Sequence, residues 1–146
     1  MKKGLRLYES VDRHLYHNRR APVAEALCGS RRAHFPASAN RSFQAYITAK
    51  SCADIYYITH RATHSDEKTR QILAKVLYLF TPLDTTGSDC RQALISNMSD
   101  YEDAIMAETA RRSHMDCIVT RNIKDYTASS VPVLSPEDFI ATLDRP

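Results

Sequence analysis

Short apolar segments and helical patterns alternate along the chain from Gln44 onward, and this alternation restricts the possible folds more than any other feature. The segments with strand character are short and bounded by polar residues: 44–49, 80–84, 117–120 and 131–134. Between them, apolar residues recur at helical spacing, for example from Ile72 to Phe80. Strands separated by helices, with few hairpin signals, predict an α/β fold in which helices cover both faces of a parallel sheet.

Side chains that cap helices well precede each helical pattern. The residues expected to cap or begin the helices are Ser51, Ser65, Ser88, either Ser99 or Asp100, and the run Ser135-Pro136-Glu137. The last of these combines a capping serine, a proline at the first helical position and an acid in the first turn. Five helices are therefore expected after residue 50.

The length of 146 residues is enough for one domain with a single hydrophobic core. No apolar run approaches the length of a membrane span and no signal peptide opens the sequence, so we expect a cytoplasmic protein with no membrane segment. The four cysteines are Cys28, Cys52, Cys90 and Cys117, and no two have CxxC spacing. This favours reduced thiols over structural zinc or disulfides.

The net charge of +3 conceals an uneven distribution along the chain. Residues 1–50 carry a net charge of +7 and residues 51–146 a net charge of −4, and the first isoleucine is Ile47. One explanation is a basic N-terminal arm that binds nucleic acid. The other is that the first third of the chain was not selected as protein.

Carboxylates gather at the start of the helix that begins near residue 99. Asp100, Glu102 and Asp103 lie in its first turn, where acids suit the helix dipole and need no further purpose. Asp125 follows the strand 117–120 closely. In parallel sheets, sites form beyond the carboxyl ends of the strands. The acids can therefore be helix caps alone, or part of a metal site whose other ligands lie elsewhere in the chain.

Three segments together resemble PIN-domain ribonucleases, in particular toxins of the virulence-associated protein C (VapC) type. They are "AYITAKSCADIYYITHR" (45–61), "SDYEDAIMAETARRSHMDCIVTRNIKDY" (99–126) and "VPVLSPEDFIATL" (131–143). The resemblance covers about two-thirds of the chain in order and with normal spacing. It implies a three-layer α/β/α fold with a central parallel sheet and an acidic pocket at its carboxyl edge.

The resemblance also assigns the acidic residues. Asp103, before Ala104, matches the family's aspartate at a helix start, and Asp100 lies one turn earlier on the same face. Asp54 falls where the family has an acid on the helix after the second strand. By this resemblance Asp54, Asp100 and Asp103 are expected to be catalytic and to bind Mg²⁺ or Mn²⁺, which prefer carboxylate oxygen and water.

A second group of expected site residues ends the strand 117–120. Asn122 occupies the position where many PIN domains have their last aspartate, and we expect it to contact the metal. Asp125 is the nearest carboxylate, and we expect it to be catalytic. Thr120 and Arg121 are expected to contact the substrate. Asn122 could instead be a turn residue that tolerates left-handed geometry.

The function implied by the resemblance is a metal-dependent endoribonuclease toxin, restrained by a cognate antitoxin and capable of forming homodimers. One alternative is a catalytically inactive PIN-fold remnant, or an antitoxin or RNA-binding module. A basic DNA-binding protein is another, but no helix-turn-helix signature supports it. Tyr56, Tyr57 and Tyr126 could stack on RNA bases, although packing in a core or an interface is the simpler expectation.

The N-terminal segment departs from the family. PIN domains begin with a strand that ends in an aspartate, and residues 1–37 contain no such pattern; Asp12 lies in a polar, basic context. Back-translation of residues 8–36 with free synonymous codons, read one base forward, can spell "MKALIDTCIIIDVLQSRKPFAEAVALIFL". We therefore interpret residues 1–37 as an aberrant, frame-shifted segment and residues 38–146 as an incomplete PIN-like domain. We expect weak packing before about Pro36, order from about Gln44, and impaired activity.

Overall fold

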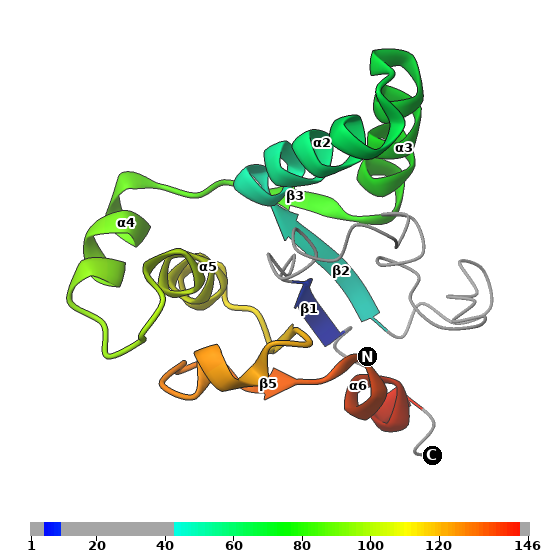
Figure 1. The fold of residues 1–146 in the computed structure, drawn as a ribbon. Helices are drawn as coiled ribbons and strands as arrows, with labels where there is room; N and C mark the ends of the chain where they lie inside the picture. Colours follow the sequence, from blue (N-terminus) through cyan, green and yellow to red (C-terminus); the bar gives the residue numbers. More distant parts are fainter. Residues whose placement is uncertain (1–4, 10–42, 144–146) are drawn as a thin grey trace.

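A computed structural model of the chain describes residues 5–9 and 43–143, and it contains one five-stranded parallel sheet (Figure 1). The order of the strands is β3-β2-β1-β4-β5, and every neighbouring pair is parallel. The strands are β1 (Leu5–Glu9), β2 (Phe43–Thr48), β3 (Thr81–Leu83), β4 (Cys117–Val119) and β5 (Val133–Leu134). The four strands expected from the sequence are all present, near the expected residues.

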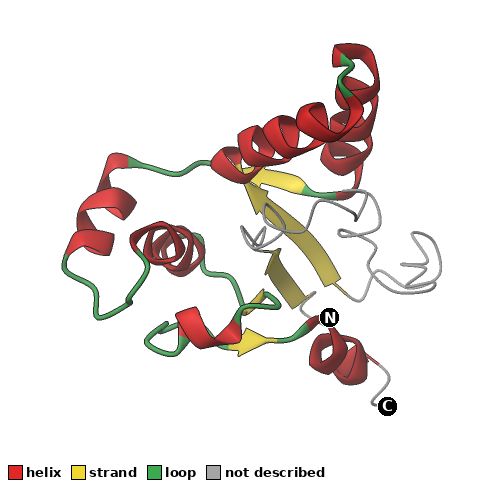
Figure 2. Cartoon of the chain, viewed as in Figure 1, coloured by secondary structure: helices red, strands yellow, loops and turns green. Residues whose placement is uncertain are grey.

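Helices connect the strands from β2 onward, as Figure 2 shows by colour. They are α2 (Ala49–Thr63), α3 (Asp66–Leu79), α4 (Gly87–Leu94), α5 (Tyr101–Arg112), the short 3-10 helix η2 (Ile123–Tyr126) and α6 (Pro136–Leu143). Parallel strands need such crossovers, because the chain must return to the same end of the sheet before the next strand begins. None of the helices in the described ranges is both long and apolar enough to cross a membrane.

The strand β4 shows how two helical layers cover the sheet. Ile118 packs into a cluster with residues of α5, whereas its neighbours Cys117 and Val119 pack with Phe139 of α6. Alternate residues of a strand point to opposite faces, so α5 and α6 lie on opposite sides of the sheet (Figure 1). All three residues of β4 are buried, as expected for a strand covered on both faces. The predicted three-layer α/β/α fold is confirmed.

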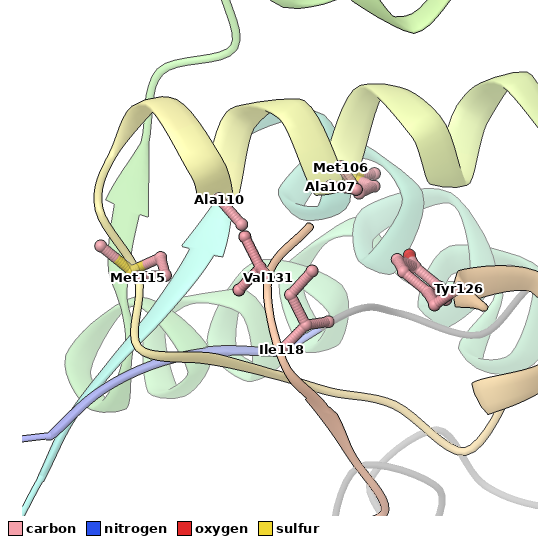
Figure 3. Close-up of a cluster of buried hydrophobic side chains, with 7 residues drawn as sticks. All are labelled: Met106, Ala107, Ala110, Met115, Ile118, Tyr126 and Val131. Carbon is pink, nitrogen blue, oxygen red and sulfur yellow. The ribbon is translucent and has the colours of Figure 1, made fainter. Parts of the chain in front are cut away.

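The largest of the hydrophobic clusters lies between α5 and the sheet (Figure 3). Its buried members are Met106, Ala107, Ala110, Met115, Ile118, Tyr126 and Val131. The alanines allow α5 to approach the strands closely, and Tyr126 brings the turn after β4 into the same core. Burial of this apolar surface fixes the position of α5, and so of the acids at its start.

The first strand, which the sequence leaves in doubt, is β1 at the centre of the sheet. It pairs with β2 from Leu5 opposite Phe43, and with β4 up to Glu9 opposite Val119. Glu9 is thus the last residue of β1, where the family resemblance asks for an aspartate. The remainder of residues 1–37, including Asp12, and the proposed change of frame near Pro36 lie outside the described residues.

Two of the expected helix caps are displaced. Thr48, not Ser51, caps α2: its side chain accepts a hydrogen bond of 3.0 Å from the amide of Ser51. Thr86, not Ser88, caps α4 and forms a capping box with Asp89. In both cases a threonine just upstream already has extended geometry and a hydroxyl, so the helix begins earlier than the serine suggests. Ser65 caps α3 as expected.

Candidate active site

Asp100 caps α5. Its Oδ1 accepts hydrogen bonds from the backbone amides of Glu102, at 2.8 Å, and Asp103, at 3.1 Å. These amides have no partner within the helix, so a carboxylate here stabilises the helix start both by hydrogen bonding and by its charge. One oxygen of Asp100 therefore has a structural role, and the helix it caps carries the next two acids.

Asp103 is connected to the turn that follows β4. The hydroxyl of Tyr126, on η2, donates a hydrogen bond of 3.0 Å to Oδ1 of Asp103. Tyr126 is only 2% exposed, so its ring packs in the core, the simpler of its two sequence interpretations. A buried tyrosine hydroxyl needs a polar partner, and the carboxylate of Asp103 supplies it. The expected meeting of α5 with the end of β4 is thereby observed.

Asp54 and the start of α5 are joined by a lysine that the sequence interpretation left out. Nζ of Lys50 lies 2.5 Å from Oδ2 of Asp54, one helical turn further along α2. The same Nζ contacts Oε1 of Glu102 on α5. The side chains of Lys50, Asp54 and Glu102 are 33%, 28% and 23% exposed, so all three retain access to solvent.

The residues after β4 form a compact turn. The side-chain amide of Asn122 donates to Oδ2 of Asp125, and the backbone amide of Asn122 donates a 3.1 Å bond to Oγ1 of Thr120. Thr120 is 2% exposed, whereas Arg121 is exposed. The side chain of Asn122 thus contacts Asp125 within this turn, and the exposed Arg121 directly precedes Asn122 in the chain.

A buried ion pair anchors the other end of α5 to α4. Nε of Arg112 donates to both carboxylate oxygens of Asp89, at 2.8 and 3.1 Å, and the Asp89 side chain is 3% exposed. Burial acts to raise the pKa of Asp89, but hydrogen bonds from Arg112 and Thr86 outweigh it and hold that pKa below its usual value. Asp89 therefore stays ionised, and its ion pair with Arg112 holds the end of α5 against α4.

The donor atoms at the start of α5 suit a hard cation. Among the described side chains, no three from His, Cys, Asp and Glu gather closely enough to hold a metal ion. Mg²⁺, however, is commonly held by one or two carboxylates with water completing its octahedron. Asp54 and Glu102 meet that requirement, because both already contact one positive charge. The residues present fit a divalent ion on this ground.

Sequence patterns could have found one half of this arrangement. Lys50 and Asp54 are four residues apart in a helical segment, a spacing that brings side chains together. Glu102 gave no such signal, because its contact with Lys50 joins helices 52 residues apart in sequence. Only the packing of α2 beside α5 creates that contact.

A model of the PIN domain family matches residues 23–124 of this sequence. The chain belongs to the PIN domain family. The match covers β2 to β4 and every candidate site residue except Asp125. No curated protein matches the sequence.

Several solved structures share the fold of this PIN domain. A toxin–antitoxin complex from Klebsiella pneumoniae superposes with a TM-score of 0.56 and 18% identity, over 89% of this chain and 96% of the other. The VapBC2 complex of Rickettsia felis, bound to a promoter DNA fragment, gives 0.60 and 13% identity, over 90% and 98%. VapBC-1 from nontypeable Haemophilus influenzae gives 0.54 and 12%, over 90% and 97%.

Proposed function

We propose that this PIN domain protein is a divalent-metal-dependent endoribonuclease, a toxin restrained by a cognate antitoxin, with impaired activity in the chain as written. One observation carries the proposal: carboxylates from α2 and α5, far apart in sequence, share a single positive charge at the start of both helices. Carboxylate oxygens that converge on one positive charge are the kind of ligand that a divalent cation prefers.

The residues proposed to bind one or two Mg²⁺ or Mn²⁺ ions are Asp54, Asp100, Asp103 and Asn122, and we add Glu102 because Lys50 joins it to Asp54. The ion, when bound, would activate a water molecule and stabilise negative charge on the cleaved phosphate. Tyr126 orients Asp103 through its hydrogen bond, which limits that carboxylate to a defined rotamer.

Three residues after β4 are proposed to act on the RNA. Asp125, held by Asn122, is the proposed base or water-positioning carboxylate. Arg121 is exposed beside it and can pair with a phosphate of the RNA. Thr120 is buried, so its contribution to substrate contact would be through the turn that its hydroxyl stabilises.

The similar structures support an antitoxin as the proposed protein partner. Those from Klebsiella and Haemophilus are toxin–antitoxin or VapBC complexes, and the VapBC2 structure includes DNA. We infer a cognate antitoxin and a homodimer for this chain, and RNA in the cytoplasm as its substrate.

A non-catalytic PIN fold is the second candidate. It is favoured by the absence, among the described side chains, of three metal-binding residues that converge on one point. A protein of this kind would bind its partner or RNA without cleaving it.

Cleavage assays with purified protein separate the two candidates. RNA is incubated with the chain in Mn²⁺, in Mg²⁺ and in a chelator, beside the variants Asp54→Asn and Asp103→Asn. We expect weak metal-dependent cleavage that each variant lowers roughly a hundredfold or more, the scale on which single catalytic groups act. Glu137→Gln, an exposed acid on α6, is the matched control and should leave the rate unchanged. Cleavage that persists in Asp103→Asn would refute the assigned site.

A further inference from the structure

Lys50 is placed unlike any other lysine described in this chain. Its ammonium contacts two carboxylates on different helices, Asp54 on α2 and Glu102 on α5. Without a positive charge between them, two such carboxylates repel each other. Lys50 therefore supplies the neutralising charge from within the protein.

The exposure of the three groups shows that this contact can be exchanged. In the Arg112–Asp89 pair, Nε of the arginine is shared between both oxygens of a carboxylate only 3% exposed, so removing the arginine would leave a buried charge. The carboxylates held by Lys50 are 28% and 23% exposed, and water can replace the ammonium there. Lysine is also a point charge on a flexible stem, without the fixed geometry of arginine. Its release therefore costs little.

We propose that Lys50 is a tethered, displaceable cation, a positioning residue that holds Asp54 and Glu102 together in the metal-free protein and competes with the divalent ion for them. This rests on the proposed function, since it concerns the same site. The ammonium and the ion cannot occupy the space between the two carboxylates together. Lys50 thus holds α2 next to α5 before the ion binds. The same contact lowers the affinity of the two carboxylates for the metal ion.

The decisive experiment measures metal binding without RNA. The full chain and its Lys50→Met variant, which keeps the length of the side chain and removes its charge, are titrated with Mn²⁺ by calorimetry. We expect Lys50→Met to bind Mn²⁺ roughly three- to tenfold more tightly, because partly exposed ion pairs are individually weak. Lys75→Met, at an exposed position of α3, is the control and should bind as the wild type does.

Thermal unfolding gives a second measurement that a purely structural lysine would not satisfy. We expect Lys50→Met to unfold at a lower temperature than the wild type without metal, and to gain more from saturating Mn²⁺. Lys50→Arg keeps the charge, and since carboxylates hold a guanidinium at least as firmly as an ammonium, it should bind Mn²⁺ no more tightly than the wild type. This variant also keeps the test decisive if Lys50→Met folds poorly: Mn²⁺ affinity higher in Lys50→Arg than in the wild type would contradict the proposal.

The possible failures are distinguishable. If the wild type binds Mn²⁺ and Lys50→Met binds it no more tightly, the competition is refuted while the metal site stands. If neither protein binds Mn²⁺ or cleaves RNA, the proposed function fails and the competition fails with it. Added Glu102→Gln should abolish the gain of Lys50→Met, because one of the two contested carboxylates is then neutral; a gain that persists would place the competition elsewhere.

Discussion

The hydroxyl of Tyr126 donates a 3.0 Å hydrogen bond to the carboxylate of Asp103, and so joins the turn after β4 to the start of α5. The tyrosine ring is part of the core, whereas Asp103 stands at the edge where the acids gather. The position of a proposed catalytic carboxylate is thus coupled directly to core packing.

Replacement of Tyr126 by phenylalanine tests this coupling. The ring still fills its place, so the loss is mainly that of a hydrogen bond to a charged group, and we expect the free energy of unfolding to fall by about 1–2 kcal/mol. Urea denaturation measures this change. Tyr101→Phe removes an exposed hydroxyl that donates at 3.2 Å to the Cys90 carbonyl, and should cost less than about 0.5 kcal/mol. Equal losses of unfolding free energy in both variants would show that the hydrogen bond to Asp103 contributes no more to stability than an exposed one.

The Arg112–Asp89 pair should dominate the attachment of α5 to α4. Arg112→Met leaves a buried carboxylate without its partner, so we expect a loss of about 2–4 kcal/mol in unfolding free energy. Arg111→Met is the neighbouring control: the half-exposed Arg111 pairs with Glu108 three residues earlier on the same helix, and its loss should cost no more than about 0.5 kcal/mol. Chemical denaturation of both variants measures the difference, and similar values would contradict the assignment.

The same pair predicts a pH dependence of stability. The folded protein holds the pKa of Asp89 below its ordinary value of 3.8, mainly through Arg112 and Thr86 acting against burial. The carboxylate therefore stabilises the fold fully above that value, and this contribution is lost as the pH falls through the lowered folded pKa. We expect the unfolding free energy of the wild type to fall more steeply below about pH 4 than that of Asp89→Asn. Parallel curves for the two proteins would refute the effect.

The reading frame of the first residues is tested most directly by the coding DNA for residues 1–40. We expect the codons present to spell the alternative sequence with its Asp-Thr-Cys when read one base forward. If they do not, the frame-shift interpretation is refuted.

Purified protein of both reading frames tests the same interpretation through stability and activity. A chain with the alternative frame restored should unfold more cooperatively and cleave RNA faster than the chain as written, because the strand that now ends in Glu9 is replaced by an apolar strand that ends in an aspartate. Cooperative unfolding and full Mg²⁺-dependent cleavage by the chain as written would contradict this. In that event Glu9→Gln tests whether Glu9, which ends β1 opposite Val119, takes the role of the first-strand aspartate.

The local features were predictable from sequence because they depend on near neighbours. The sequence predicts Ser65 as a helix cap, narrows the cap of α5 to Ser99 or Asp100, and predicts the apolar run at β4 as a strand buried on both faces. Caps, strand character and helical spacing depend on residues a few positions apart, and parallel order follows from the alternation of strands and helices. Even here, Thr48 and Thr86 displaced the expected serines, because several hydroxyls stood close to each helix start.

The contacts that organise the candidate site were decided by the tertiary structure alone. Lys50 meets Glu102 across 52 residues of sequence, and Tyr126 meets Asp103 across 23. The central place of β1 between β2 and β4 likewise has no counterpart in local pattern. Sequence determined which residues carry charge and which elements they begin. Which charges touch depended on how the helices pack on the sheet, since packing sets distances that no spacing along the chain encodes.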